Sequence, residues 1–163
     1  MRKAVVCFFI AIAFTGFSGS VYACTCAGGL SLEQHFKGAD AVFVGEVTEV
    51  KHNVNRIQID GKEYIGLGTI EVTFKVTRVA KGGMKVNDSV TVRTPDQGPA
   101  CGIEGWSQEK PGVSWVVYAD TGDSFLGLVT SIPKDMFVTS HCDRTSRTAN
   151  ADADLKYFDS LKR

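Results

Sequence analysis

Two cysteines separated by one residue, Cys24 and Cys26, directly follow an export-type leader, and they constrain this chain more than any other feature. The leader has a basic start, an apolar run over residues 4–14, and small side chains at both key positions of Val21-Tyr22-Ala23. We therefore expect residues 1–23 to be a signal peptide that is removed. The mature chain then begins with a cysteine that carries a free α-amino group.

Export and an even cysteine count together favour disulfide bonds. Loss of the signal removes Cys7 and leaves Cys24, Cys26, Cys101 and Cys142. The first two are poor partners for each other, because a ring over one intervening residue strains the ~4.4–6.8 Å Cα separation that disulfides prefer. Each should therefore reach one of the two later cysteines. Either pairing closes loops of roughly 80–120 residues, worth about 4–5 kcal/mol in the chain-entropy model.

The length and charge of the mature chain limit its class. Removing residues 1–23 from 163 leaves 140, enough for one domain over residues 24–163. The signal takes two of the 18 basic residues and none of the 18 acidic ones, so the net charge becomes about −2. No basic patch indicates nucleic acid, and no second apolar run is long enough to span a membrane. We expect a secreted or periplasmic monomer.

A lipoprotein is the alternative to a simple cut. Val21-Tyr22-Ala23 followed by Cys24 loosely resembles a bacterial lipoprotein cleavage box, in which a lipid would be attached to that cysteine. Lipidation would leave three cysteines for pairing, so the even count favours the plain cut.

The residue pattern predicts a mostly β chain with short helices near its ends. A capping box at Ser31 starts a short helix that Gly38 can end, and Asn150 can cap a helix over about 150–162. Residues 70–77 alternate apolar and polar side chains, as a half-buried strand does. Further strands are expected over residues 41–50, with a bend or bulge at Gly45, and over 86–94, 115–119 and 125–130.

The connections are polar or rich in turn residues. Residues 51–68 read as a long hairpin connection or loop, and Pro95 should stop the strand before it. Residues 95–112 form a loop system tethered by Cys101. Five short strands with turns and terminal helices indicate a five-stranded oligonucleotide/oligosaccharide-binding (OB) type antiparallel barrel, stapled by disulfides, although other small barrels share this pattern.

An ordered set of motifs resembles a known family. The set consists of Cys24-Thr25-Cys26, Arg78-Val79-Ala80-Lys81-Gly82, Thr94-Pro95 leading to Ala100-Cys101-Gly102, Trp115-Val116-Val117-Tyr118-Ala119 and His141-Cys142-Asp143. In this order they resemble the N-terminal domain of the tissue inhibitors of metalloproteinases, within the netrin-like module superfamily, and point to a bacterial homologue. The resemblance implies an OB barrel with disulfides Cys24–Cys101 and Cys26–Cys142.

The resemblance also implies a site and a partner, the catalytic zinc of a metalloprotease. The α-amine and carbonyl of Cys24 would chelate that zinc and displace its water, so the only metal is in trans and the chain needs no cofactor of its own. Thr25 would enter the specificity pocket beside the zinc, and Cys26 would pin the segment. Gly98, Pro99 and Ala100 would form a second contact ridge.

A second function stays open. Residues 28–36 lack the further cysteine that the animal inhibitors carry, which is compatible with a netrin-like interaction module that binds another exported protein without inhibiting it. No Ser-His-Asp order, phosphate loop or supported carboxylate pair argues for an enzyme. His35, His52, Trp106 and Trp115 read as surface or packing residues, and Asn87-Asp88-Ser89 matches a glycosylation sequon.

Overall fold

A computed structural model of the chain describes Cys26 and residues 28–54, 56–65, 68–96, 101–121 and 136–161. The described elements are α2 (Leu32–Gly38), β1 (Ala41–Asn53), β2 (Arg56–Ile59), β3 (Lys62–Ile65), β4 (Thr69–Lys81), β5 (Ser89–Pro95), η2 (Trp106–Gln108), β6 (Ser114–Thr121), β7 (Phe137–Val138), β8 (Ser146–Arg147), η3 (Thr148–Asn150) and α3 (Asp152–Ser160). The described part of the chain is therefore mostly β with two short α-helices, as the sequence predicts. The strand expected over residues 125–130 lies outside the described residues.

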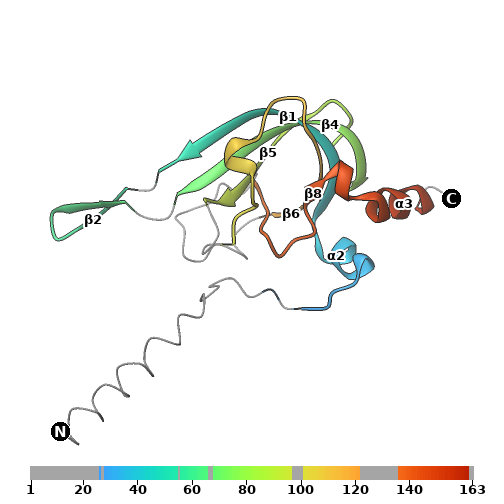
Figure 1. The fold of residues 1–163 in the computed structure, drawn as a ribbon, viewed down its shortest axis with the longest axis horizontal. Coiled ribbons are helices and arrows are strands. Elements are labelled where there is room, and N and C mark those ends of the chain that lie inside the picture. Colours follow the sequence, from blue (N-terminus) through green and yellow to red (C-terminus); the bar gives the residue numbers. More distant parts are fainter. Residues whose placement is uncertain are drawn as a thin grey trace, which may run out of the picture.

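Five strands form a ring-like sheet in the order β1-β4-β5-β7-β6, and β6 pairs back onto β1 (Figure 1). β8 pairs with Trp115 and Val116 near the start of β6 and forms a short sixth strand. Among the described strands all pairings are antiparallel except that of β5 with β7, which is parallel. The expectation of a wholly antiparallel sheet is therefore wrong at this pair. The reason is geometric, because strand direction cannot alternate all the way around a closed ring with an odd number of strands.

The ring separates two apolar clusters. The larger one fills the inside of the sheet and includes Phe43, Phe74, Trp106 and Trp115, whose rings pack in sequence at centroid distances of 5.5–5.9 Å. Both tryptophans are thus packing residues, as expected. The smaller cluster lies on the outer side of β1 and β6, and its members are Ala39, Val42, Val44, Val116, Tyr118, Ala151 and Phe158. Helices α2 and α3 cover it (Figure 1).

The strand predicted from alternation over residues 70–77 is confirmed as part of β4. Its apolar residues from Ile70 to Val76 are almost completely buried inside the sheet, while Lys75 and Thr77 are exposed. The neighbouring strand β5 begins later than expected, at Ser89, and includes Pro95 as its last residue. A proline is tolerated there because the end of a strand does not need every ladder hydrogen bond.

The bulge expected at Gly45 is present. The register between β1 and β4 shifts between Val44 and Gly45, where the backbone of β1 comes very close to β4. A Cβ atom at Gly45 would lie 2.9 Å from the Cβ of Phe74 and 3.1 Å from the ring of Phe43. Glycine is required here because any side chain would collide with the inner cluster.

The polar segment between β1 and β4 contains a second, two-stranded sheet. β2 and β3 pair antiparallel around Asp60 and Gly61, which both have positive φ angles, 51° and 72°. Two central residues with positive φ are the mark of the type I′ turn, whose twist matches that of a hairpin. The hairpin extends beyond the ring from the ends of β1 and β4 (Figure 1). The expectation of a hairpin in this segment is therefore confirmed for residues 56–65.

Helix α2 begins and ends as the sequence predicts. Ser31 and Gln34 form the reciprocal capping box, with Gln34 N donating to Ser31 Oγ at 3.2 Å and Ser31 N donating to Gln34 Oε1 at 2.7 Å. At its other end the ammonium of Lys81 donates to three carbonyl oxygens, those of Phe36, Lys37 and Ala39. This contact ties the last turn of α2 to the end of β4.

Helix α3 differs from expectation at both ends. Ala151 is its N-cap residue and makes no side-chain capping bond, because the chain enters through the η3 turn, which contains Asn150. Phe158 is buried in the smaller cluster, whereas Leu161, just after the helix, is 47 % exposed. No helix in the described part of the chain is long and apolar enough to cross a bilayer.

We predict that Gly45→Ala destabilises the protein by about 1–3 kcal/mol, because the new methyl group overpacks the inner cluster against Phe74. Chemical denaturation followed by tryptophan fluorescence measures the change. Gly83→Ala is the matched control, since a Cβ there has nothing within 4 Å. Equal stabilities of the two variants would contradict the close approach at Gly45.

Candidate functional site

Much of the expected site lies outside the described residues. This applies to Cys24 and Thr25, and to the expected ridge over residues 98–100, which contains Gly98, Pro99 and Ala100. The structure does describe Cys26, Cys101 and Cys142, so the surroundings of the cysteines can be built up from their contacts.

A disulfide joins Cys26 to Cys142, with an S–S distance of 2.17 Å, a Cα–Cα distance of 5.2 Å and a sequence separation of 116 residues. These are the two residues that the family resemblance pairs. The bond attaches the segment before α2 to the turn that follows β7. Closing a loop of this length is worth about 4–5 kcal/mol in the chain-entropy model, so the bond both positions the segment and stabilises the fold.

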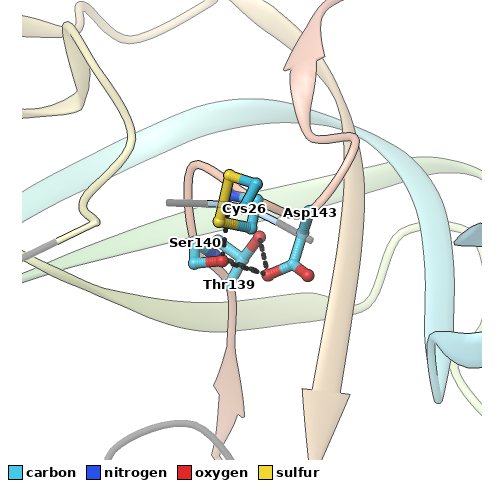
Figure 2. The surroundings of a disulfide bond; sticks show 5 residues. Cys26, Thr139, Ser140 and Asp143 are labelled. Carbon is cyan, nitrogen blue, oxygen red and sulfur yellow. Dashed lines mark hydrogen bonds between the residues drawn. A yellow bond between two sulfur atoms is a disulfide. The ribbon is translucent and has the colours of Figure 1, made fainter. Parts of the chain in front are cut away.

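The turn that carries Cys142 is held by its own hydrogen bonds (Figure 2). Asp143 accepts from the backbone N–H of Ser140 at 2.7 Å and from its hydroxyl at 2.9 Å, and the N–H of Cys142 donates to Ser140 Oγ at 3.1 Å. The hydroxyl of Thr139 donates to the carbonyl oxygen of Tyr118 at 2.8 Å, which fixes the turn to β6. Because Ser140 is completely buried, these bonds satisfy groups that water cannot reach.

The turn lies directly against the third described cysteine. The backbone N–H of His141 donates to the carbonyl oxygen of Cys101 at 2.7 Å. Cys101 is itself disulfide-bonded, to a partner outside the described residues, and has a positive φ of 64°. The Cys24–Cys101 pairing stays a prediction. The segment around Cys101 therefore lies next to the turn that carries Cys142.

Carboxylates gather behind this turn and influence one another. Burial raises the pKa of Asp143 above its ordinary value, against the lowering effect of the hydrogen bonds from Ser140. Burial also raises the pKa of Asp120, and the nearby charge of Asp143 adds to the rise. Asp40 has a lowered pKa, because its carboxylate accepts bonds from the hydroxyl and the backbone N–H of Thr121.

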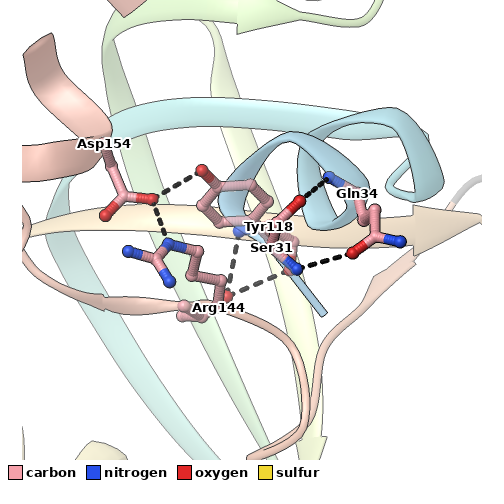
Figure 3. Close-up of polar contacts among 6 residues, drawn as sticks. Ser31, Gln34, Tyr118, Arg144 and Asp154 are labelled. Atoms are coloured by element: carbon pink, nitrogen blue, oxygen red, sulfur yellow. Dashed lines mark hydrogen bonds and ion pairs between the residues drawn. The ribbon is translucent and has the colours of Figure 1, made fainter. Parts of the chain in front are cut away.

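A second polar group anchors α3 to the outer side of the ring (Figure 3). Asp154 is 2 % exposed, and its Oδ1 accepts from the hydroxyl of Tyr118 at 2.6 Å and from Nε of Arg144 at 2.7 Å. Burial, followed by the hydrogen bond to this carboxylate, raises the pKa of the Tyr118 hydroxyl far above its usual range. The tyrosine therefore stays neutral and serves as a hydrogen-bond donor.

The sequence assigned no role to Ser140 or to the Arg144–Asp154 pair, and it marked Asp143 only as part of a motif. In the sequence Asp154 is simply an acidic residue in the first turn of a helix, whereas in the structure it is buried and bonded to Tyr118 of β6. The spacing of Ser140 and Asp143 is a visible signal, because a hydroxyl and a carboxylate three residues apart commonly close a turn. Among the described residues no three His, Cys, Asp or Glu side chains form a group that could hold a metal ion.

Comparisons with known proteins add no family to these observations, because neither a protein-family model nor a curated protein matches the chain.

Replacing Asp143 by alanine should cost about 1–3 kcal/mol, since it leaves the buried N–H and hydroxyl of Ser140 without their acceptor. Urea unfolding of the oxidised protein measures this change. Asp159→Ala is the control, because that carboxylate is 68 % exposed and pairs with Arg78 at the surface. A cost no larger than that of the control would show that the turn does not depend on Asp143.

Asp143→Asn should also change how stability depends on pH. A raised pKa means that the folded state keeps the proton longer than the unfolded chain, whose aspartate titrates near about 3.9. The stability of the wild type relative to this variant should therefore fall as the pH rises from about 4 and level off above the raised pKa of Asp143. Unfolding free energies measured at several pH values give this difference. A difference that rises with pH would contradict the direction of the shift.

Proposed function

We propose that this protein is an exported inhibitor of zinc metalloproteases that acts through its mature N-terminus. The observation that carries the proposal is that Cys26, Cys101 and Cys142 lie close together in the structure. Cys26 is bonded to Cys142, and the N–H of the neighbouring His141 donates to the carbonyl oxygen of Cys101. A chain that begins at Cys24 has its third residue covalently fixed to a rigid turn, so its terminal amine loses little freedom on binding.

The chemistry of such a terminus suits a catalytic zinc. The α-amine and carbonyl oxygen of one residue close a five-membered chelate, and a catalytic zinc keeps one position that a ligand can take from water. The amine must be neutral to donate, and its ordinary pKa of about 7.7–8.0 makes that accessible. The metal belongs to the protease, so the inhibitor needs none. Thr25 would contact the pocket beside the zinc, and Gly98, Pro99 and Ala100 would contact the protease alongside.

The architecture supports the family proposal. We infer that the ring is an OB-type barrel of the netrin-like kind, because β5 and β6 follow each other in the ring's chain order but are not neighbours in it, and β7 lies between them. A closed five-stranded ring with such a Greek-key connection is the architecture of OB folds. Under this proposal residues 24–163 are one domain, exported after removal of residues 1–23.

We predict that one alanine inserted before Cys24 abolishes inhibition of zinc endopeptidases and leaves the fold unchanged. The insertion moves the amine away from the carbonyl that completes the chelate, while Cys26 keeps its bond to Cys142. Inhibition constants against a panel of zinc endopeptidases, with circular dichroism as the fold check, provide the measurement. One alanine added after Arg163 is the control. Unchanged inhibition by the insertion variant would overturn the chelation mechanism.

The same preparation separates the remaining alternatives. The intact mass of the mature protein shows whether the chain starts at Cys24, whether that residue carries a diacylglycerol group, and whether two disulfides are present. A correctly processed protein that inhibits none of the proteases would favour the netrin-like interaction module, which binds another exported protein.

A further inference from the structure

A cavity of about 410 Å³ opens beside the segment after Cys101 and the turn that carries Cys142. Its walls come from the chain just after Cys101, from the turn before Cys142, from the start of β6, and from β8 and η3. The residues that matter for its chemistry are Glu104, Gly105, Trp115, His141, Arg147 and Asn150. This volume is in the range of small-ligand sites in proteins.

Arg147 is held in one orientation at the cavity wall. Its guanidinium carbon lies 5.7 Å from the centroid of the Trp115 ring, over the aromatic face. Its Nε donates to Glu109 Oε2 at 3.0 Å, and the same oxygen accepts from the indole N–H of Trp115 at 3.0 Å. The carboxylate is only 4 % exposed, so it is a fixed anchor rather than a mobile surface group.

The outer edge of this guanidinium remains available. Within the described parts of the chain, neither Nη atom of Arg147 has a hydrogen-bond partner, and the side chains of His141 and Asn150 have none either. A Cβ added at Gly105 would lie 3.9 Å from Arg147 Nη2, so the absence of a side chain at Gly105 leaves space next to these donors. A guanidinium keeps four further N–H donors when only Nε is used.

The cavity wall therefore offers several hydrogen-bond donors, which suit a ligand that accepts hydrogen bonds. Two parallel N–H groups of a guanidinium match the two oxygens of a carboxylate, and the pair is stronger and more directional than neutral hydrogen bonds. Among the described residues that line the cavity, Glu104 is the one carboxylate, and its charge opposes an anion there. The fixed orientation of Arg147 lowers the entropy cost of binding.

We propose that this cavity is a carboxylate-binding site, in which the Nη edge of Arg147 and the amide of Asn150 receive an acidic side chain or the terminal carboxylate of a peptide. The proposed site uses none of the residues proposed to chelate zinc, and its occupation requires no protease.

The test uses the mature, oxidised protein labelled with ¹⁵N and three small probes. N-acetylglycine carries a terminal carboxylate, and N-acetylaspartic acid α-amide carries a side-chain carboxylate. N-acetylglycinamide is the neutral control. Saturable shifts of the Trp115 indole and Arg147 Nε–H signals are expected with one or both acids and not with the neutral amide. A response to one acid alone identifies the source of the carboxylate. Equal shifts with the neutral amide, or none with either acid, would overturn the proposal.

Two substitutions at the rim should move the affinity in opposite directions. Asn150→Asp should weaken binding of the acids about tenfold, since it removes a donor and adds a like charge. Glu104→Gln should tighten it a few-fold, because it removes the opposing charge. Neither change breaks the Arg147–Glu109–Trp115 contacts. Asn87→Asp in the turn before β5 makes the same chemical change away from the cavity and should leave the affinity unchanged. Affinities that do not respond in this order would contradict a site at Arg147.

Discussion

The pairing of β1 along both of its edges is the constraint on which the rest of the fold depends. β1 pairs with β4 over nearly its whole length, while Ala41 to Glu46 also pair with β6. This double pairing closes the ring. The two faces of the same segment are buried by the two apolar clusters. Phe43 and Val47 face the inner cluster, and Val42 and Val44 face the outer one. The bulge at Gly45 lets β1 bend. Glycine is needed there because β1 and β4 come too close for a side chain.

Each outer attachment then uses a polar contact to hold a helix against this closed sheet. Lys81 gathers three carbonyl oxygens at the end of α2, and Asp154 joins α3 to Tyr118 and Arg144. These groups are costly to bury alone, and each is satisfied by several partners. Both helices are short, so the contacts rather than intrinsic helix stability determine where they lie.

The parts of the fold that follow from local pattern could be predicted, and the parts that depend on distant partners could not. The alternation in β4 and the capping box at Ser31 are visible because their causes lie within a few residues. The bulge is marked by the glycine at position 45, although the contact that requires it comes from Phe74 on β4. The turn of the hairpin also has a local signal, because Asp60-Gly61 is a dipeptide typical of type I′ turns. By contrast β7 has two residues and pairs on both sides with strands remote in sequence, so no local periodicity announces it. The burial of Asp154 depends likewise on Arg144 and Tyr118.

The candidate site follows the same division. Cysteine counting limits each early cysteine to one of two late partners, but it cannot reveal that His141 belongs to two features at once. Its backbone N–H holds the carbonyl of Cys101, and the residue also lines the cavity that contains Arg147. The disulfide-bonded turns therefore form one wall of the carboxylate site. If a ligand binds the cavity only when these turns are formed, its binding stabilises the turns. Formation of the turns favours its binding by the same free energy. Loss of the Cys26–Cys142 bond would thus weaken both the placement of the N-terminus and the cavity beside it, since a single turn supports them.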